Sequence, residues 1–377
     1  MRICHVTSMH RWDDDRIYER AACCLARNGH EVIVIAVRDG SARINDVDIQ
    51  GVPVRTGWRR RLLSARDVWQ LARTVNADIL HFHDPDLIPW MLHLKMMGCT
   101  VVYDSHENFI VRFYQWRLPS VLRAPCARLF RRFERWAVSR FDGIITPDAH
   151  IFKEFEDVCR DGAVIRNTHD IERLDTHVSK QSKDPVPVLY TSGSNLPDRH
   201  CEPMILAMPA ILKVIPDARL RFAGFYGPGY RDHLAELARE MGVAGQVELL
   251  GAKPYFEHFS RSYSATAGCV FLQDSPKNRN ANSNRLFEYM YCGLPVIAED
   301  LPGPRTVVQD SDCGLVIDSS RPEAIAEAFI YLVRNPEECR RYGENGRKAV
   351  RERYNFARDL EALEALYRRI QTTGKGR

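Results

Sequence analysis

An acidic residue, Glu288, stands near the start of a short predicted helix that runs directly into a buried strand at residues 294–298. The free amides and the positive dipole end at the start of a helix favour an anionic ligand. A carboxylate one turn further on can accept hydrogen bonds from vicinal ribose hydroxyl groups. The segment therefore predicts a site for a nucleotide that carries phosphates. The alternative is an ordinary amphipathic helix that ends at Gly293 and Pro295.

Polar residues also follow two predicted strands in the first half of the chain. His81, His83 and Asp84 lie at the end of one strand, and His106 and Glu107 follow the next. The carboxyl ends of parallel strands form the edge at which open α/β sheets bind ligands. We therefore expect both groups at a cleft. For His81 and His83 the alternative is a pair of alternating strand residues, one of them buried and hydrogen-bonded.

Metal binding must be weighed for the same region. The His-x-His at residues 81–83, the Asp-x-Asp at residues 84–86 and the Asp run at residues 13–15 all contain side chains that metals accept as ligands. Aspartate is also common at helix starts and in turns, where it accepts hydrogen bonds from backbone amides. We interpret the Asp clusters in this second way and predict that the protein requires no metal.

Length and composition indicate a two-domain globular enzyme. A chain of 377 residues exceeds the usual size of one domain and can bury two separate cores. Hydrophobic residues make up 45% and charged residues 27%, as in globular enzymes. Eleven scattered cysteines without a Cys-x-x-Cys pair favour reduced thiols in a cytoplasm over disulfides or a zinc site. No apolar stretch approaches about 18 residues, which argues against export and against a membrane span.

Alternating strands and helices predict two doubly wound parallel sheets. We expect a first domain over residues 1–178, a polar linker around 179–185 and a second domain over residues 185–354, with a ligand cleft between the domains. Neither half has a Gly-x-Gly-x-x-Gly after its first strand, which counts against a dinucleotide ligand. Strands are expected at residues 2–7, 31–37, 79–82, 100–104, 143–146, 186–191, 219–223, 246–250, 266–272, 294–298 and 314–317.

The segment 280–298 resembles the donor-site signature of family 4 glycosyltransferases, which are retaining enzymes of the GT-B fold. Their signature is Glu-x7-Glu followed by a small-residue helix end and Gly-x-Pro-Val. Glu288 matches the second Glu, whereas Asn280 stands where the first is usual. The resemblance implies that Glu288 holds the ribose of a nucleotide-diphospho-sugar. It supports a nucleotide site more firmly than any particular sugar, because the first Glu is the residue that faces the sugar in the family.

The motifs of the first half look like the paired signatures of one branch of this family. The resemblance places His106 at the catalytic centre beside the donor sugar. Residues 14–17 resemble the Asp-x-Arg-Ile variant of that branch, in which Arg16 either reaches a phosphate or an acidic acceptor, or pairs with the aspartates. The acceptor-side residues implied in this way are Asp15, Arg16, His83, Asp84 and Glu107.

The donor diphosphate needs positive charge, and relatives commonly supply an Arg and a Lys after the first strand of the second domain. Arg199 occupies the place of the Lys, and a guanidinium can hold phosphate oxygens in a bidentate fork. Arg285 is a candidate for the second charge, with a surface salt bridge as the alternative. We predict catalytic roles for His106, Arg199 and Glu288. The predicted nucleotide-sugar contacts are Gly193, Ser194, Asn195, Arg199, Asn280, Asn284, Arg285, Leu286 and Glu288.

Arginines alternate with aromatic and aliphatic residues between Phe109 and Phe141. A helix of this composition is typical of an element that contacts anionic lipid surfaces. The alternative is a solvated helix whose aromatics pack into the first domain. Nucleic-acid binding would also use basic residues among aromatics, but no recognised module supports it.

We therefore expect a retaining, metal-independent glycosyltransferase without a cofactor, in which the C-terminal helix, within residues 355–377, crosses back to the first domain. Its acceptor would be a saccharide or a lipid-linked saccharide in the synthesis of a polysaccharide, a lipopolysaccharide or another glycolipid. The expected location is the cytoplasm, including the inner face of the membrane. Two alternatives remain: a sugar-nucleotide 2-epimerase of the same fold, and a non-catalytic subunit that binds nucleotide. The sequence predicts no oligomeric state.

Overall fold

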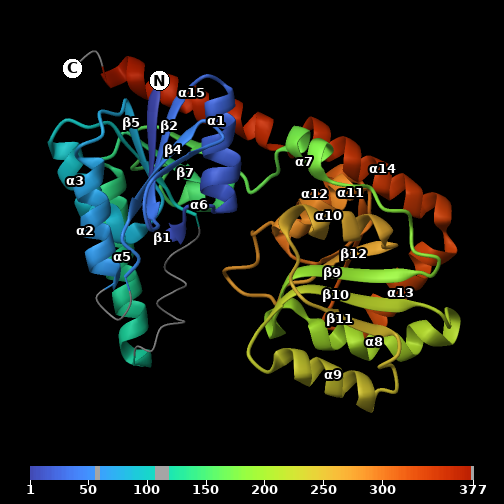
Figure 1. The fold of residues 1–377 in the computed structure, drawn as a ribbon. Helices are drawn as coiled ribbons and strands as arrows, with labels where there is room; N and C mark the ends of the chain where they lie inside the picture. Colours follow the sequence, from blue (N-terminus) through green and yellow to red (C-terminus); the bar gives the residue numbers. More distant parts are fainter. Residues whose placement is uncertain (56–59, 107–118, 375–377) are drawn as a thin grey trace. The chain divides into compact units, whose positions relative to one another are not determined.

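In a computed structural model, which describes residues 1–55, 60–106 and 119–374, the chain forms two compact units. The first unit comprises Met1–Asn167 together with Phe356–Arg377, and the second comprises Thr168–Asn355. Each unit is a parallel α/β sheet covered by helices on both faces, as Figure 1 shows. The prediction of two doubly wound sheets is confirmed, and the C-terminal helix packs on the first unit as expected.

The sheet of the first unit has eight strands in the order β3-β4-β2-β1-β5-β6-β7-β8. All neighbouring strands pair in parallel except β3, which runs antiparallel to β4 at the edge. The strands are β1 (Arg2–Arg11), β2 (Glu31–Val37), β3 (Ala42–Ile44), β4 (Val47–Val52), β5 (Ile79–Phe82), β6 (Val101–Asp104), β7 (Gly143–Thr146) and β8 (Gly162–Val164).

Alternate residues of these strands enter two separate cores, because successive side chains of a strand point to opposite faces. Val32 and Val34 of β2 pack under η1, α1 and α15, whereas Ile33 and Ile35 pack under α2, α3, α5 and α6. Figure 1 shows α2, α3 and α5 on one side of the sheet and α15 on the other. The helices are η1 (Asp15–Ala22), α1 (Cys23–Arg27), α2 (Arg60–Ala72), η2 (Pro85–Leu87), α3 (Ile88–Met96), α5 (Ser120–Val138), α6 (Ala149–Lys153) and α15 (Phe356–Gly374).

The sheet of the second unit has six strands, all parallel, in the order β11-β10-β9-β12-β13-β14. Helices α8, α9 and α13 cover one face, and α7, α10, α11, α12 and α14 cover the other. The strands are β9 (Val188–Asn195), β10 (Arg219–Tyr226), β11 (Val247–Leu250), β12 (Ala267–Val270), β13 (Val296–Glu299) and β14 (Gly314–Ile317). The helices are α7 (Ile171–His177), η3 (Pro197–Arg199), α8 (Cys201–Val214), α9 (Tyr230–Glu240), α10 (Tyr255–Ser264), α11 (Asn284–Cys292), α12 (Pro302–Ser311), α13 (Pro322–Arg334) and α14 (Pro336–Glu352).

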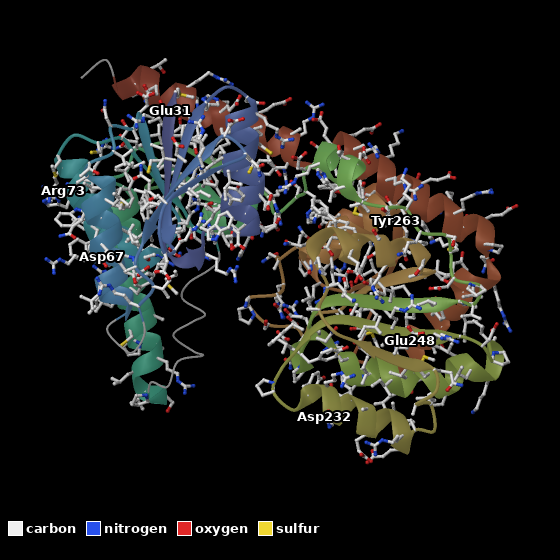
Figure 2. All side chains as sticks on the ribbon, viewed as in Figure 1. Glu31, Asp67, Arg73, Asp232, Glu248 and Tyr263 are labelled. Carbon is white, nitrogen blue, oxygen red and sulfur yellow. The ribbon has the colours of Figure 1, made fainter. Side chains whose placement is uncertain are left out.

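The edge strand β11 of the second unit carries one charged residue among three apolar ones. Glu248, labelled in Figure 2, pairs with Arg219 and Arg221 of the neighbouring strand β10 at 3.0 and 2.6 Å. Charged side chains on an edge strand discourage pairing with a strand of another chain.

The ends of β9 and β10 approach each other closely at two glycines. Gly224 adopts a φ of +129°, and a Cβ on it would lie 2.0 Å from the carbonyl oxygen of Gly193. Only glycine fits both the backbone conformation and the space. The close approach extends strand pairing through Tyr226 and Asn195, so β9 carries its last residues to the rim of the sheet.

The structure divides the chain earlier than the sequence pattern suggested. The predicted first domain ended at residue 178, but residues 168–178 pack with the second unit. Leu174 and Val178 are the reason, because both are buried in the core beneath α10 and α11. The sequence pattern also omitted the edge hairpin β3–β4 and the short strand β8, since edge strands of three to six residues carry little periodicity.

Candidate functional site

The end of β9 in the second unit presents exposed backbone at Gly193 and Ser194. Gly193 has a φ of +84°, a conformation that favours glycine. Asn195 follows and is fully buried, yet neither its Oδ1 nor its Nδ2 has a hydrogen-bond partner among the described residues. A buried amide without a partner costs free energy unless a ligand satisfies it. These three predicted residues therefore lie together at one strand end.

Two guanidinium groups lie at the same end of the sheet. Arg285 is buried, and it donates from Nη1 to Thr191 Oγ1 at 2.9 Å and from Nη2 to the carbonyl oxygen of Ser194 at 3.4 Å. A buried position against β9 does not fit the alternative of a surface salt bridge. Burial and the nearby charge of Arg285 lower the pKa of Arg199. Arg199 Nε lies 3.6 Å from Oδ1 of Asp198, with which it forms an ion pair, but has no hydrogen-bond partner among the described residues. The two like charges share a region that an anion would stabilise.

Glu288 lies one turn into α11, which follows Ser283 at its N-cap. Its side chain is 11% exposed and its Oε1 lies 3.8 Å from Nε2 of His169. Tyr289 holds the helix to β9 through a 2.9 Å hydrogen bond between its hydroxyl and Ser192 Oγ. The helix ends at Gly293, whose φ of +68° provides the predicted C-cap. The carboxylate is therefore fixed near the N-terminal end of a rigid helix.

The remaining predicted contacts of the second unit divide into two kinds. Asn284 opens α11 and Asn280 lies on the loop before it, both half-buried. A Cβ on Gly303 would lie 2.7 Å from the backbone of Asn280, so this loop packs against the start of α12. Leu286 is different, because its side chain is fully buried in the core and its amide donates to Ser283. We leave Leu286 out of the proposed contacts.

In the first unit, strand register brings three polar residues to one face of the sheet. His5 of β1 lies opposite His81 of β5, and His81 lies opposite Val102 of β6. Asp104 lies two residues beyond Val102, so it faces the same side. This is the side covered by α15, and Tyr367 of that helix bonds His81 Nδ1 at 2.7 Å. Neighbouring strands thus build a buried polar cluster from residues far apart in the sequence.

His83, Asp104 and His106 form the most compact part of this cluster. Nδ1 of His83 lies 2.8 Å from Nε2 of His106, and Oδ2 of Asp104 lies 3.3 and 3.1 Å from these two atoms. Nε2 of His83 faces Nδ1 of His5 at 3.0 Å. Burial, reinforced by His81, holds the pKa of both His5 and His83 well below the ordinary value, so both are neutral at pH 7. The side chain of His106 is 15% exposed and provides the solvent-facing end of the cluster.

Arg16 anchors the cluster through Asp104. Its Nη2 and Nε lie 2.9 and 3.1 Å from the two carboxylate oxygens, and its Nη1 donates to Asn167 Oδ1 and to the carbonyl oxygen of Ile165. Burial alone would raise the pKa of Asp104, but Arg16 and His106 hold it well below the ordinary value. Of the two expected roles for Arg16, pairing with an aspartate fits this geometry. The partner is Asp104 of β6 rather than an aspartate of its own loop.

Asp84 binds the end of β1 and does not serve as a helix cap. Its Oδ2 accepts from the hydroxyl of Thr7 at 2.5 Å and from the amide of Ser8 at 2.7 Å, while its Oδ1 lies 2.9 Å from Nδ1 of His10. Its side chain does not cap the helix η2 that it precedes. The interpretation as helix-start chemistry is therefore wrong for Asp84. That interpretation is confirmed for Asp14, which accepts from two amides of the first turn of η1.

One predicted acceptor-side residue, Asp15, does not join the histidine cluster in the described part of the chain. Asp15 pairs with the buried Arg20 within η1. Glu107 lies outside the described residues, as does the first part of the Arg-rich segment.

Sequence reasoning gave no site role to His5, His10, Asp104 or His169, although Asp104 opens the Asp-x-His-Glu motif that contains His106. One signal was available in the sequence. Alternate residues of a strand point to the same face of a sheet, so His5, His81 and Asp104 face one side once the strands are aligned. His10 and His169 offered no such signal, because His10 lies in the part of β1 where the strand register shifts beyond Val6, and His169 lies at a unit boundary.

Two family models match adjoining parts of the chain. Residues 16–173 match the family described as Glycosyltransferase Family 4, and residues 172–349 match the family described as Glycosyl transferases group 1. The chain is a glycosyltransferase built from these two domains. The strand-end residues described above lie within the matched parts, except those of β1, which precede residue 16.

Relatives and solved structures agree with this assignment. The glycosyltransferase is 24% identical over 365 residues to a putative glycosyltransferase, EpsD, of Bacillus subtilis (strain 168), covering 90% of this chain and 89% of the relative. It is 22% identical to a phosphatidyl-myo-inositol mannosyltransferase of Mycobacterium leprae (strain TN), covering 79% and 75%. The structure of Anabaena HepE in complex with UDP matches with a TM-score of 0.72 at 14% identity, covering 97% of this chain and 99% of that chain. The fold is GT-B, as predicted.

Proposed function

We propose that this glycosyltransferase moves a sugar from a nucleotide-diphospho-sugar to a saccharide or a lipid-linked saccharide, with retention of anomeric configuration and without a required metal ion. The product would belong to a cell-surface polysaccharide or a glycolipid such as lipopolysaccharide. The observation that carries the proposal is the group of Arg199, Arg285, Asn195 and Glu288 at the strand ends of the second unit.

Each member of this group matches one part of a nucleotide-diphospho-sugar. Glu288 is the acceptor for the ribose hydroxyls. Arg199 and Arg285 supply the charge that a departing diphosphate requires, and Asn195 offers an amide whose donor and acceptor are both unused among the described residues. The UDP bound to Anabaena HepE supports a nucleotide diphosphate as the ligand. Fixed guanidinium charge would replace the metal ion that some transferases use.

A thermal-shift screen with UDP, GDP, ADP and TDP would identify the donor base, because a ligand that binds only the folded protein raises its melting temperature. With the base known, Glu288→Gln should raise the dissociation constant of that nucleotide about 10- to 100-fold. The variant replaces charge-assisted hydrogen bonds to the ribose, worth about 1.5–3 kcal/mol, by weaker neutral ones. Isothermal titration of the purified protein measures the change.

Glu337→Gln, at an exposed position in the first turn of α14, is the matched control and should bind as the parent does. An unchanged dissociation constant for Glu288→Gln would remove the ribose assignment. In the same preparation, product sugar attached to an acceptor demonstrates transfer. If the nucleotide sugar is converted but no sugar is transferred, the protein is an epimerase. If neither product forms, the protein is a non-catalytic subunit that binds nucleotide.

For the first unit we propose His106 as the catalytic residue, with His83 and Asp84 on the acceptor side. His106 is the partly exposed end of an otherwise buried polar cluster. Asp104 and His83 fix its Nε2, which leaves the rest of the ring available to a sugar hydroxyl or to charge that develops during transfer. The buried residues behind it act as positioning residues.

We also propose that α5 contacts an anionic membrane surface. Leu122, Leu129 and Trp136 recur every seven residues, which places them along one stripe of the helix, and they are 47%, 70% and 49% exposed. Arg132 is exposed on the same helix, and Arg140 is exposed just beyond its C-terminal end. Phe133, in contrast, packs into the core, as the alternative interpretation expected. None of the helices that the structure describes is long and apolar enough to cross a bilayer, so the proposed contact is peripheral.

Vesicle co-sedimentation tests this contact. The parent should bind vesicles containing phosphatidylglycerol more tightly than neutral vesicles, and Leu122→Ser with Leu129→Ser should weaken binding by at least about tenfold, since each buried leucine contributes roughly 1.5–3 kcal/mol. Met96→Ser, at a 79% exposed position on α3, is the matched control. Equal binding by parent and double variant would exclude α5 as the contact.

A further inference from the structure

The buried polar cluster of the first unit contains the ligand geometry of a transition-metal site. Zinc in proteins is held by histidine nitrogens and carboxylate oxygens at about 2.0–2.2 Å, so neighbouring ligand atoms of a tetrahedral site lie ~3.3 Å apart. The three distances among His83 Nδ1, Asp104 Oδ2 and His106 Nε2 are 2.8, 3.1 and 3.3 Å. These atoms form a triangle of the size that one ion can cap.

The surroundings of the triangle match those of a metal site as well. Histidines that bind metals usually donate their other ring N–H to a protein acceptor, which fixes the tautomer. Nε2 of His83 faces Nδ1 of His5 at 3.0 Å, and Oδ1 of Asp104 is held by Arg16 at 2.9 Å. Second-layer partners of two of the three ligands are therefore already in place.

Unused nitrogens form a second, independent observation. Nε2 of His81 is buried without a hydrogen-bond partner among the described residues, and it lies 3.7 Å from Oδ2 of Asp104. Nε2 of His5 is also buried and also has no hydrogen-bond partner among the described residues. Hydrogen bonding within the cluster thus leaves two imidazole nitrogens unsatisfied, which a cluster built only for hydrogen bonding would avoid.

We propose that His83, Asp104 and His106 bind one divalent ion of the zinc type, and that the bound ion inhibits sugar transfer by replacing the hydrogen bonds that hold Nε2 of His106 and so moving the ring out of its catalytic position. The inhibitory half rests on the proposed function of His106. The fourth coordination position faces the partly exposed side of His106 and is open to water, as in zinc sites with three protein ligands. Arg16 neutralises the charge of Asp104, so we expect a dissociation constant on the order of micromolar rather than that of a structural zinc site.

The first test measures Zn²⁺ alone. The EDTA-treated full chain should take up one equivalent in competition with a chromogenic chelator, and Mg²⁺, which prefers oxygen ligands, should not compete. His83→Ala and Asp104→Asn should each weaken uptake at least about tenfold. His150→Ala, at an exposed position on α6, should leave uptake unchanged. Melting curves in EDTA show whether each variant is folded.

A spectroscopic test excludes binding by the eleven cysteines. Co²⁺ at the proposed site should give a spectrum of nitrogen and oxygen ligands without a thiolate charge-transfer band. No uptake by the parent, a thiolate band, or equal uptake by a folded His83→Ala variant would overturn the site.

Inhibition is measured separately. Transfer by the parent should fall in proportion to Zn²⁺ occupancy and return fully with EDTA. Full activity at saturating Zn²⁺ would overturn the inhibitory half. Absence of transfer in EDTA with every donor would instead contradict the proposed function, while Zn²⁺ uptake would still report on the site.

Discussion

His106→Ala should lower the turnover number for sugar transfer by about 10²–10³-fold, the loss typical when one preorganised group at a reacting centre is removed. The imidazole is held at Nε2 by Asp104 at 3.1 Å and by His83 at 2.8 Å, so the parent ring is fixed before substrate arrives. The dissociation constant of the nucleotide should change by less than about twofold, because the residues proposed to bind it belong to the second unit. Steady-state kinetics and nucleotide titration of the same preparation measure the two quantities.

His150→Ala provides the control for loss of a histidine from the first unit. His150 is exposed on α6 and belongs neither to the histidine cluster of the first unit nor to the proposed nucleotide site of the second. It should transfer sugar as the parent does. Equal turnover by His106→Ala and parent would remove His106 from the active site. A parallel loss of nucleotide affinity and of melting temperature would show that His106 acts through folding instead.

Arg199→Gln should lower turnover by a similar factor, about 10²–10³-fold, and should weaken binding of the nucleoside diphosphate. A departing diphosphate accumulates negative charge, and Arg199 and Arg285 are the cations beside the strand end where the phosphates are proposed to lie. Removal of one cation also relieves the repulsion between the two, so the melting temperature without ligand should stay equal or rise. Kinetics with the donor identified by the thermal-shift screen measure the effect.

Arg199→Lys separates charge from hydrogen-bond geometry at this position. Nε of Arg199 makes no hydrogen bond among the described residues, so a lysine in its place would lose no hydrogen bond at that atom. The Lys variant should therefore recover most of the lost turnover. Arg334→Gln, at the exposed end of α13, is the control for loss of one positive charge from the second unit. Equal losses for Arg199→Lys and Arg199→Gln would contradict a role that depends on charge.

The strands that carry the candidate site were predictable because they are short, apolar and bounded by polar residues. The strands at residues 31–37, 79–82, 143–146 and 314–317 have the bounds that the sequence predicted. The prediction placed His83 and His106 at strand ends for the same reason. It treated β1 as ending at residue 7, whereas Thr7, Ser8 and Met9 continue the strand while bonding Asp84. The hydrogen bond between Met9 and Asp84 joins residues 75 positions apart, so the hydrophobic pattern of a few neighbouring residues cannot predict it.

The roles of charged residues were harder to predict than their positions. Arg16 was expected to face a phosphate or a local aspartate, and it binds Asp104, which is 88 residues away. For Arg285 a surface salt bridge was the alternative to a phosphate contact, and the side chain is buried against Thr191. Burying a charged side chain costs free energy unless a compensating group lies beside it. The order of the strands in the sheet decides which such groups lie within reach of Arg16 and Arg285.

The amino-acid sequence by itself determined the number and type of the sheets, the strand ends that carry polar residues, and the resemblance of residues 280–298 to a donor site. These properties depend on hydrophobic period, caps and spacing, which act over a few residues. Only the tertiary structure decided that His5, His83, Asp104 and His106 form one buried cluster. Their contact depends on the register of three parallel strands, and a shift of one residue would turn each side chain to the other face.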